Sequence, residues 1–79
     1  MENIENKVLN ILVEICGTKK VTKDRDLNLI ECGYLNSMGV VELLDDLEEE
    51  FDIDIPLDDF SLDRFDTINK VIEYVKSKL

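Results

Sequence analysis

Three segments of this 79-residue chain carry apolar side chains at the spacing of a single helix face. Residues three and four apart lie on the same side of an α-helix, so each segment predicts an amphipathic helix with a stripe that must be buried. The stripes are Ile4, Val8, Ile11, Leu12 and Ile15; Val40, Leu43, Leu44, Leu47 and Phe51; and Ile68, Val71, Ile72, Val75 and Leu79. A chain of this length supports one core, and we therefore expect one all-α domain over residues 1–79.

The expected helix ends carry recognisable capping residues. Gly17 stops the first helix, Asn36 or Ser37 caps the second, and Thr67 caps the last. Residues 18–36 show no sustained period, but their apolar content predicts a long loop pinned to the core (Val21, Leu27, Leu29, Ile30, Tyr34 and Leu35). A short helical turn is expected around residues 58–62. The fold class is thus a small three- to four-helix bundle with a long loop between helices 1 and 2.

The residue types exclude several kinds of active site. The chain has no histidine, which rules out serine–histidine and cysteine–histidine nucleophiles. Its two cysteines, Cys16 and Cys32, are too few for a tetrahedral zinc site. We expect both to be buried, reduced thiols, with one disulfide as the alternative. The sequence predicts neither an enzyme nor a metal site.

The balance of charge narrows the choice of partners. The net charge of −10 repels nucleic acid and anionic lipid and excludes a nucleic-acid binder. The first ten residues lack a basic region followed by an apolar run. No apolar stretch in the chain approaches the ~18 residues of a membrane span. We expect a soluble, cytoplasmic protein that does not insert into the membrane.

The acidic residues gather in one part of the chain. Between Glu42 and Asp66, twelve acids accompany a single cation, Arg64, whereas the remaining residues carry a net charge of +1. Such a run is often only a solvated helix face. On the second helix, however, two apolar residues fall on the side away from the core stripe, Met38 and Val41. They are surrounded by Glu42, Asp45, Glu48 and Glu49. This arrangement favours a docking patch for a basic partner with an apolar pocket.

Ser37 stands at the start of the same helix. Free backbone amides and the positive end of the helix dipole favour an attached anion there, such as a phosphodiester. A serine at a helix start is also an ordinary cap. Spacing alone leaves both interpretations open.

The stretch ECGYLNSMGVVELL, residues 31–44, resembles the phosphopantetheine attachment site of carrier proteins, with Ser37 at the position of the modified serine. More narrowly, nearly the whole chain resembles the D-alanyl carrier family of teichoic-acid D-alanylation. That resemblance rests on Val13, Glu14, Ile15 and Cys16 in the first helix, on Gly39, Val41, Glu42, Leu43 and Leu44 in the second, and on Phe51, Asp52, Ile53, Pro56, Phe60, Asp63, Phe65, Thr67 and Asn69 beyond it.

The resemblance implies a carrier and not an enzyme. A phosphopantetheinyl transferase would place 4′-phosphopantetheine from coenzyme A on Ser37, a D-alanine–carrier protein ligase would load the thiol, and a membrane-bound O-acyltransferase would receive the D-alanine. The docking residues of this monomeric carrier would be Asn36, Met38, Val41, Glu42, Asp45, Glu48 and Glu49.

Two residues depart from the family pattern. Asn36 stands where carriers usually have Asp before the serine, and Ile68 stands where the family tends to have Pro. Asn caps a helix as well as Asp does. The negative charge that the transferase normally meets before the serine is missing, however, and this affects how efficiently Ser37 would be modified. Two alternatives stay open: a discrete acyl or peptidyl carrier for fatty-acid, polyketide or peptide synthesis, and a carrier-like interaction module that is never modified.

Overall fold

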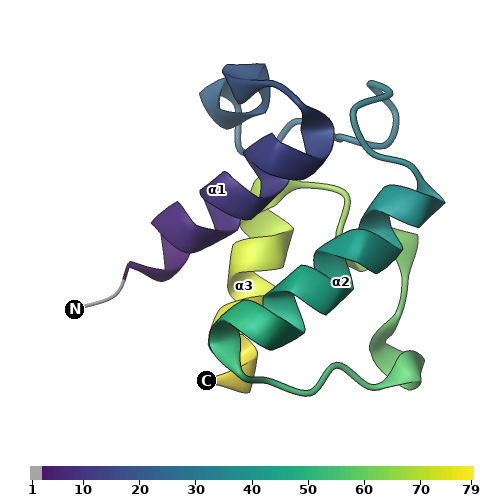
Figure 1. The fold of residues 1–79 in the computed structure, drawn as a ribbon. Coiled ribbons are helices and arrows are strands. Elements are labelled where there is room, and N and C mark those ends of the chain that lie inside the picture. The colour runs from purple at the N-terminus through teal and green to yellow at the C-terminus, as the bar shows by residue number, and fades with distance from the viewer. Residues whose placement is uncertain (1–2) are drawn as a thin grey trace.

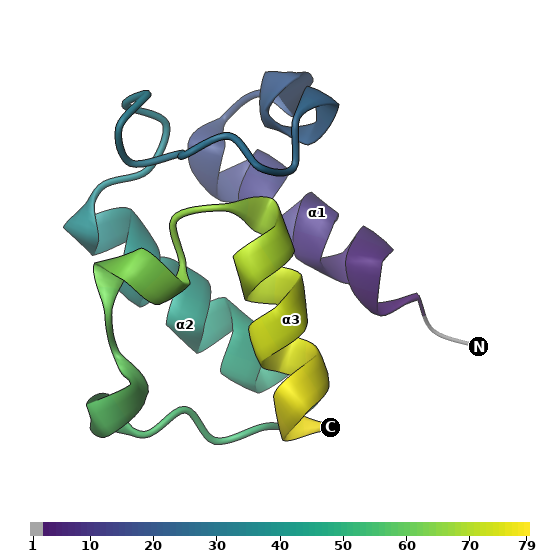
Figure 2. The same cartoon turned by 180° about the vertical axis from the view of Figure 1, so that it is seen from behind.

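A computed structural model describes residues 3–79, which contain helices and no strands. The elements in chain order are α1 (Ile4–Cys16), the 3₁₀ turn η1 (Lys19–Lys23), α2 (Ser37–Phe51), the 3₁₀ turns η2 (Leu57–Asp59) and η3 (Leu62–Arg64), and α3 (Ile68–Lys78). α1 packs against both α2 and α3. α3 lies behind the other two helices in Figure 1 and in front of them in Figure 2. The predicted all-α bundle with a long first loop is confirmed.

The helix ends form at the predicted capping residues. Asn36 Oδ1 accepts a hydrogen bond from the Gly39 amide at 2.8 Å, and Thr67 Oγ1 accepts one from the Lys70 amide at 3.1 Å. Gly17 ends α1 with φ at 75°, in the left-handed region that a residue without a Cβ adopts most easily. Asn36, and not Ser37, therefore caps α2.

The core is built from the predicted stripes, but six of their members are not fully buried. The fully buried side chains include Val8 and Leu12 of α1, Val40, Leu43 and Leu47 of α2, and Ile68, Val71 and Val75 of α3. Five are half-buried and pack against its edge (Ile4, Ile11, Ile15, Leu44 and Phe51). Leu79 is 65% exposed, because α3 ends at Lys78. Tyr74, which the predicted stripe of the last helix does not include, is buried and packs its ring edge-to-face on buried Phe65, with 5.1 Å between the ring centroids.

The long loop is pinned to the core, as predicted. Val21, Leu29 and Leu35 are buried, and residues 19–23 form η1, which the sequence did not indicate. Backbone hydrogen bonds tie the loop to the start of α3: the Leu29 amide donates to the Asp66 carbonyl at 2.7 Å, and the Asn69 amide to the Arg25 carbonyl at 3.1 Å. These contacts hold the segment that leads into Ser37.

The two thiols differ from the expected pair of buried cysteines. Both are free; Cys16 is half-buried, and burial raises the pKa of its thiol. Cys32 is exposed, so the expectation of burial was wrong there. The reason is local, since its amide donates to the Asn28 carbonyl at 3.1 Å in a turn that holds this residue at the surface.

The segment after α2 is held between α2 and α3. Two short 3₁₀ turns replace the single one expected around residues 58–62. Asp59 accepts a hydrogen bond from the Tyr74 hydroxyl at 2.7 Å and lies 3.1 Å from the Lys78 ammonium. The Tyr74 hydrogen bond, followed by that from Lys78, lowers the pKa of Asp59, while burial and the Asp59 carboxylate raise the pKa of Tyr74. This cluster fixes η2 to the end of α3.

Candidate functional site at the start of helix α2

Ser37 is the first residue of α2, and its side chain is exposed. No hydrogen bond within residues 3–79 uses its hydroxyl, because the Asn36 carboxamide already caps the Gly39 amide. The Val40 amide donates to the Asn36 carbonyl at 2.9 Å, whereas the amides of Ser37 and Met38 have no acceptor among the described residues. The structure thus brings together a free hydroxyl and two free backbone donors.

This set of groups fits a phosphodiester. The first-turn amides of a helix point outward and carry the positive end of its dipole, so a phosphate on the neighbouring hydroxyl finds donors without any rearrangement. Asn36 adds a neutral cap and no negative charge beside that phosphate. The free hydroxyl and the free amides can therefore hold an anion that is attached at Ser37.

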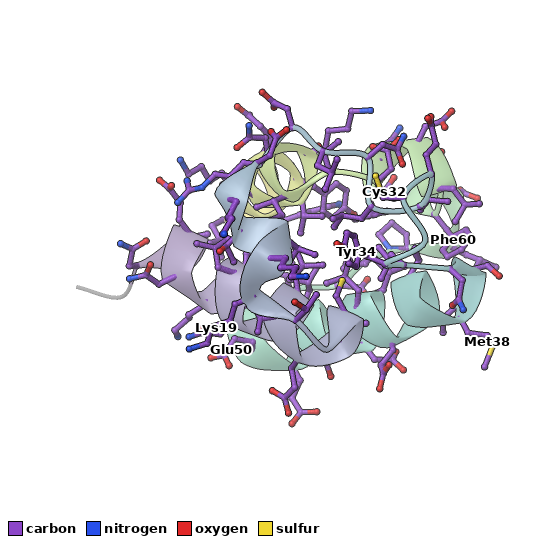
Figure 3. All side chains as sticks on the ribbon, turned by 90° about the horizontal axis from the view of Figure 1, so that it is seen from above. Lys19, Cys32, Tyr34, Met38, Glu50 and Phe60 are labelled. Atoms are coloured by element: carbon purple, nitrogen blue, oxygen red, sulfur yellow. The ribbon has the colours of Figure 1, made fainter. Side chains whose placement is uncertain are left out.

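The predicted docking residues occupy the outer face of α2. Met38 is 77% exposed and Val41 48% exposed, so neither is needed for the core. Figure 3, which looks onto the molecule from above, shows Met38 pointing outward at the edge. Asn36 and three of the four predicted carboxylates are exposed as well (Glu42, Asp45 and Glu49).

Glu48 differs from the other predicted docking carboxylates. It is half-buried, and its Oε2 accepts a hydrogen bond from the Ile55 amide at 2.9 Å. One of its oxygens therefore holds the segment after α2 against that helix. Its first role is structural, and only the remaining oxygen can face a partner.

Two grooves lie beside Val41 on the outer face of α2. A groove of about 490 Å³ runs beside Met38 and Val41 toward the loop (Ile15, Gly33, Tyr34, Leu35, Asn36, Gly39, Glu42 and Asp45). Gly39 permits this close packing, because a Cβ there would lie 2.9 Å from Leu35 Cδ1. The other, of about 360 Å³, lies between α2 and the segment that follows it (Val41, Leu44, Asp45, Glu48, Ile55, Leu57 and Phe60).

The second groove contains apolar residues that sequence reasoning did not assign to a site. Leu57 is 89% exposed and Phe60 36% exposed. The feature of the sequence that could have indicated their role is that two large apolar residues follow Pro56 in an acidic segment. Their position beside Val41 depends on the Asp59–Tyr74 contact, which no local pattern reveals.

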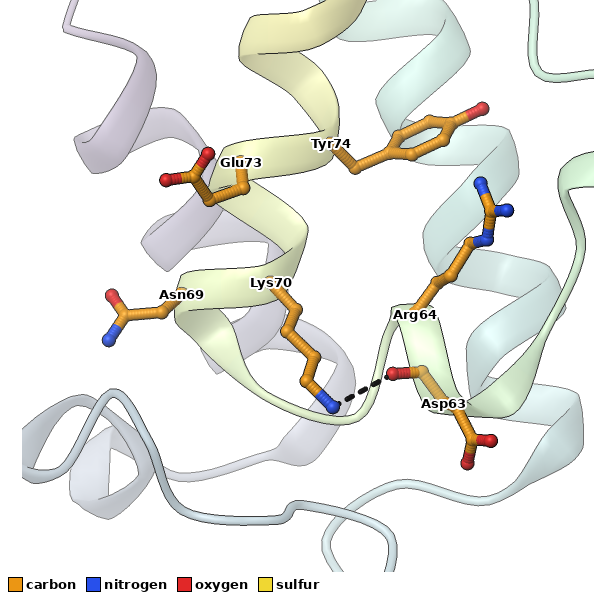
Figure 4. A pocket seen from close by; sticks show the side chains of 6 residues that line it. All are labelled: Asp63, Arg64, Asn69, Lys70, Glu73 and Tyr74. Carbon is orange, nitrogen blue, oxygen red and sulfur yellow. Dashed lines mark hydrogen bonds between the residues drawn. The ribbon is translucent and has the colours of Figure 1, made fainter.

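A further hollow, of about 510 Å³, lies between η3 and α3 (Asp63, Arg64, Asn69, Lys70, Glu73 and Tyr74; Figure 4). Lys70 Nζ donates to the Asp63 carbonyl at 3.0 Å and lies 3.0 Å from an Asp66 carboxylate oxygen. Its ammonium is therefore already engaged. Ser37 and the predicted docking residues do not line this hollow.

Residues 3–79 offer neither a metal site nor a membrane-spanning helix. No group of three or more His, Cys, Asp or Glu side chains is placed to hold a metal ion. No described helix has the length and apolar character that crossing a membrane requires.

Comparison with known proteins identifies the family of the chain. Residues 6–75 match the family model described as the phosphopantetheine attachment site. The D-alanyl carrier protein of Lacticaseibacillus rhamnosus is 45% identical over 75 residues, which cover 95% of this chain and 93% of the relative. The chain belongs to the D-alanyl carrier protein family. The D-alanyl carrier protein of Enterococcus faecalis is 37% identical over 75 residues, which cover 95% of this chain and 96% of the relative. A member of this family is a phosphopantetheine carrier, and its prosthetic group is 4′-phosphopantetheine.

Replacing the neutral residue before Ser37 tests the departure from the carrier pattern. We expect Asn36→Asp to speed modification by a phosphopantetheinyl transferase, because it restores a negative charge beside the hydroxyl. Its free energy of unfolding should change by less than about 0.5 kcal/mol, since both side chains cap equally well. Intact mass against time and thermal unfolding measure the two effects. Equal modification rates would mean that the transferase does not sense this charge.

Proposed function

We propose that Ser37 bears the 4′-phosphopantetheine arm and that the arm carries D-alanine as a thioester. The carrier would take D-alanine from a cytoplasmic ligase and deliver it to a membrane-bound O-acyltransferase for teichoic-acid D-alanylation. The observation that carries this proposal is the free Ser37 hydroxyl beside two free amides, with Asn36 acting as the cap. The family name of the relatives supports D-alanine as the cargo.

In this proposal the carrier is a cytoplasmic monomer and not an enzyme. The bound arm supplies a thiol, and the partners supply the catalytic groups. The chain contributes a rigid position for the arm, because the loop contacts at Leu29 and Asn69 hold the segment before Ser37. Free donors at the helix start stabilise the phosphate of the arm.

The partners would dock on the outer face of α2. Met38 and Val41 provide an apolar centre, and the carboxylates around it attract a basic surface and speed association. Asn36, Glu42, Asp45, Glu49 and the free oxygen of Glu48 complete this surface. The transferase, the ligase and the acyltransferase would bind it in turn, since each must reach the same arm.

Loading of the modified protein tests the cargo. The protein is first converted with coenzyme A and a phosphopantetheinyl transferase, and then incubated with ATP, D-alanine and a D-alanine–carrier protein ligase. We expect intact mass to rise by one D-alanyl group, and the increase to disappear on treatment with hydroxylamine, which cleaves thioesters.

The same assay separates the alternatives. If the ligase leaves the modified protein unloaded while a fatty-acyl or peptide-synthesis enzyme loads it, the chain is an acyl or peptidyl carrier. Without any phosphopantetheine gain in the first step, it is an unmodified interaction module.

A further inference from the structure

The cations of this acidic chain divide into two groups. Six of its nine Lys and Arg side chains lie within 4.0 Å of a carboxylate oxygen (Lys7, Arg25, Arg64, Lys70, Lys76 and Lys78). The other three, Lys19, Lys20 and Lys23, have no ion pair within residues 3–79. All three belong to the five-residue turn η1 and are exposed. We call them the η1 lysine patch.

The turn that presents this patch is held in place. Val21, in the middle of η1, is fully buried in the core. Thr18 Oγ1 accepts from the Lys20 amide at 3.1 Å, and Thr22 Oγ1 donates to the Lys19 carbonyl at 2.8 Å. The three ammonium groups thus project from a fixed backbone.

The surroundings of the patch favour a charged surface over a protein pocket. The exposed large apolar side chains of the described chain all lie elsewhere (Met38, Val41, Leu57, Phe60, Leu62 and Leu79). Protein interfaces are organised around an apolar or aromatic centre. A layer of anionic lipid headgroups attracts lysines without one.

The patch and the start of α2 lie on different sides of the bundle. η1 is at the top in Figures 1 and 2, whereas the start of α2 lies lower and on the opposite side, and Figure 3 shows Lys19 and Met38 on opposite sides. The molecule measures 30 × 28 × 18 Å. Charges are screened over about 8 Å at physiological ionic strength, so acids on the far side of the molecule contribute little to a contact made at η1.

We propose that the η1 lysine patch binds anionic phospholipid headgroups and holds the carrier at the membrane surface with the η1 end of the bundle facing the lipid. The overall charge of −10 and the carboxylates of Asp24 and Asp26, which follow η1 directly in the chain, keep this binding weak and sensitive to salt. Its biological purpose rests on the delivery step proposed above. The binding itself requires neither the arm nor D-alanine.

Vesicle sedimentation at low salt tests the patch with the full, unmodified chain. Each lysine near an anionic surface is worth about fivefold in the partition coefficient, so replacing all three should lower it by up to about 100-fold. The variant is Lys19→Gln with Lys20→Gln and Lys23→Gln, and the vesicles contain equal parts of phosphatidylcholine and phosphatidylglycerol. Pure phosphatidylcholine vesicles should bind neither protein.

A matched variant controls for net charge. Arg64→Gln with Lys70→Gln and Lys76→Gln removes three cations whose side chains are more than half exposed but are near carboxylates. Circular dichroism verifies that both triple variants remain folded. The control should keep more of the wild-type binding than the η1 variant. The proposal is overturned if the wild type does not bind anionic vesicles, or if the two triple variants lose binding equally.

A dye on Cys32 reports the orientation. This exposed thiol lies in the loop between η1 and α2, which runs along the top of the molecule, as η1 does, in Figures 1 and 2, and a polarity-sensitive dye there should shift its emission to the blue on anionic vesicles. The same dye at residue 54, introduced as Asp54→Cys in a Cys32→Ser background, should shift less. Equal shifts at both positions would contradict the orientation. Neither result depends on D-alanine loading, so this proposal and the proposed function can fail separately.

Discussion

Ser37→Ala should abolish attachment of phosphopantetheine without unfolding the protein. The hydroxyl is the atom to which the phosphate would be joined, and alanine offers no replacement. Asn36 makes the capping hydrogen bond at 2.8 Å, so the free energy of unfolding should change by less than about 0.5 kcal/mol. The measurement is intact mass after incubation with coenzyme A and a phosphopantetheinyl transferase, in which the wild type gains one phosphopantetheine.

The chain provides its own controls for this substitution. Ser61 and Ser77 are its other two serines, and Ser77 Oγ donates to the Tyr74 carbonyl at 2.6 Å. Ser61→Ala should be modified as fully as the wild type. A mass gain in folded Ser37→Ala protein would place the arm on another residue and refute the assignment.

Leu47→Ala should lower the stability of the fold and Val41→Ala should slow loading, although both residues belong to α2. Leu47 is fully buried, and replacing it leaves a cavity that should cost about 2 to 5 kcal/mol. For a domain of this size that loss lowers the melting temperature by roughly 10 to 30 °C. Val41 is 48% exposed, so Val41→Ala should change the melting temperature little and instead slow loading by the ligase.

Thermal unfolding and the loading rate of modified protein distinguish the two roles. Leu44→Ala should fall between them, because Leu44 is half-buried at the edge of the core and lines the groove next to Val41. The docking surface on α2 would be wrong if Val41→Ala destabilised the fold as much as Leu47→Ala while the folded fraction was loaded at the normal rate.

The sequence by itself determined the three helices and their caps. Helical periodicity and capping depend on residues within four positions of one another, and Gly17, Asn36 and Thr67 act where they were expected. The exposure of Met38 and Val41 followed from the same periodicity. Membership of the carrier family also followed from sequence, since the residues around Ser37 and beyond it carry the resemblance.

The tertiary structure decided what depends on distant residues. Tyr74 is buried because Phe65 and Asp59 meet it from other segments, and Glu48 is drawn to Ile55 by a backbone amide seven residues away. Local periodicity contains no information about such contacts. Which Lys and Arg side chains lie near a carboxylate also depends on distant residues, because an ion pair such as Lys7 with Glu50 joins positions far apart in the chain. Only the folded chain shows that Lys19, Lys20 and Lys23 have no carboxylate partner among the described residues.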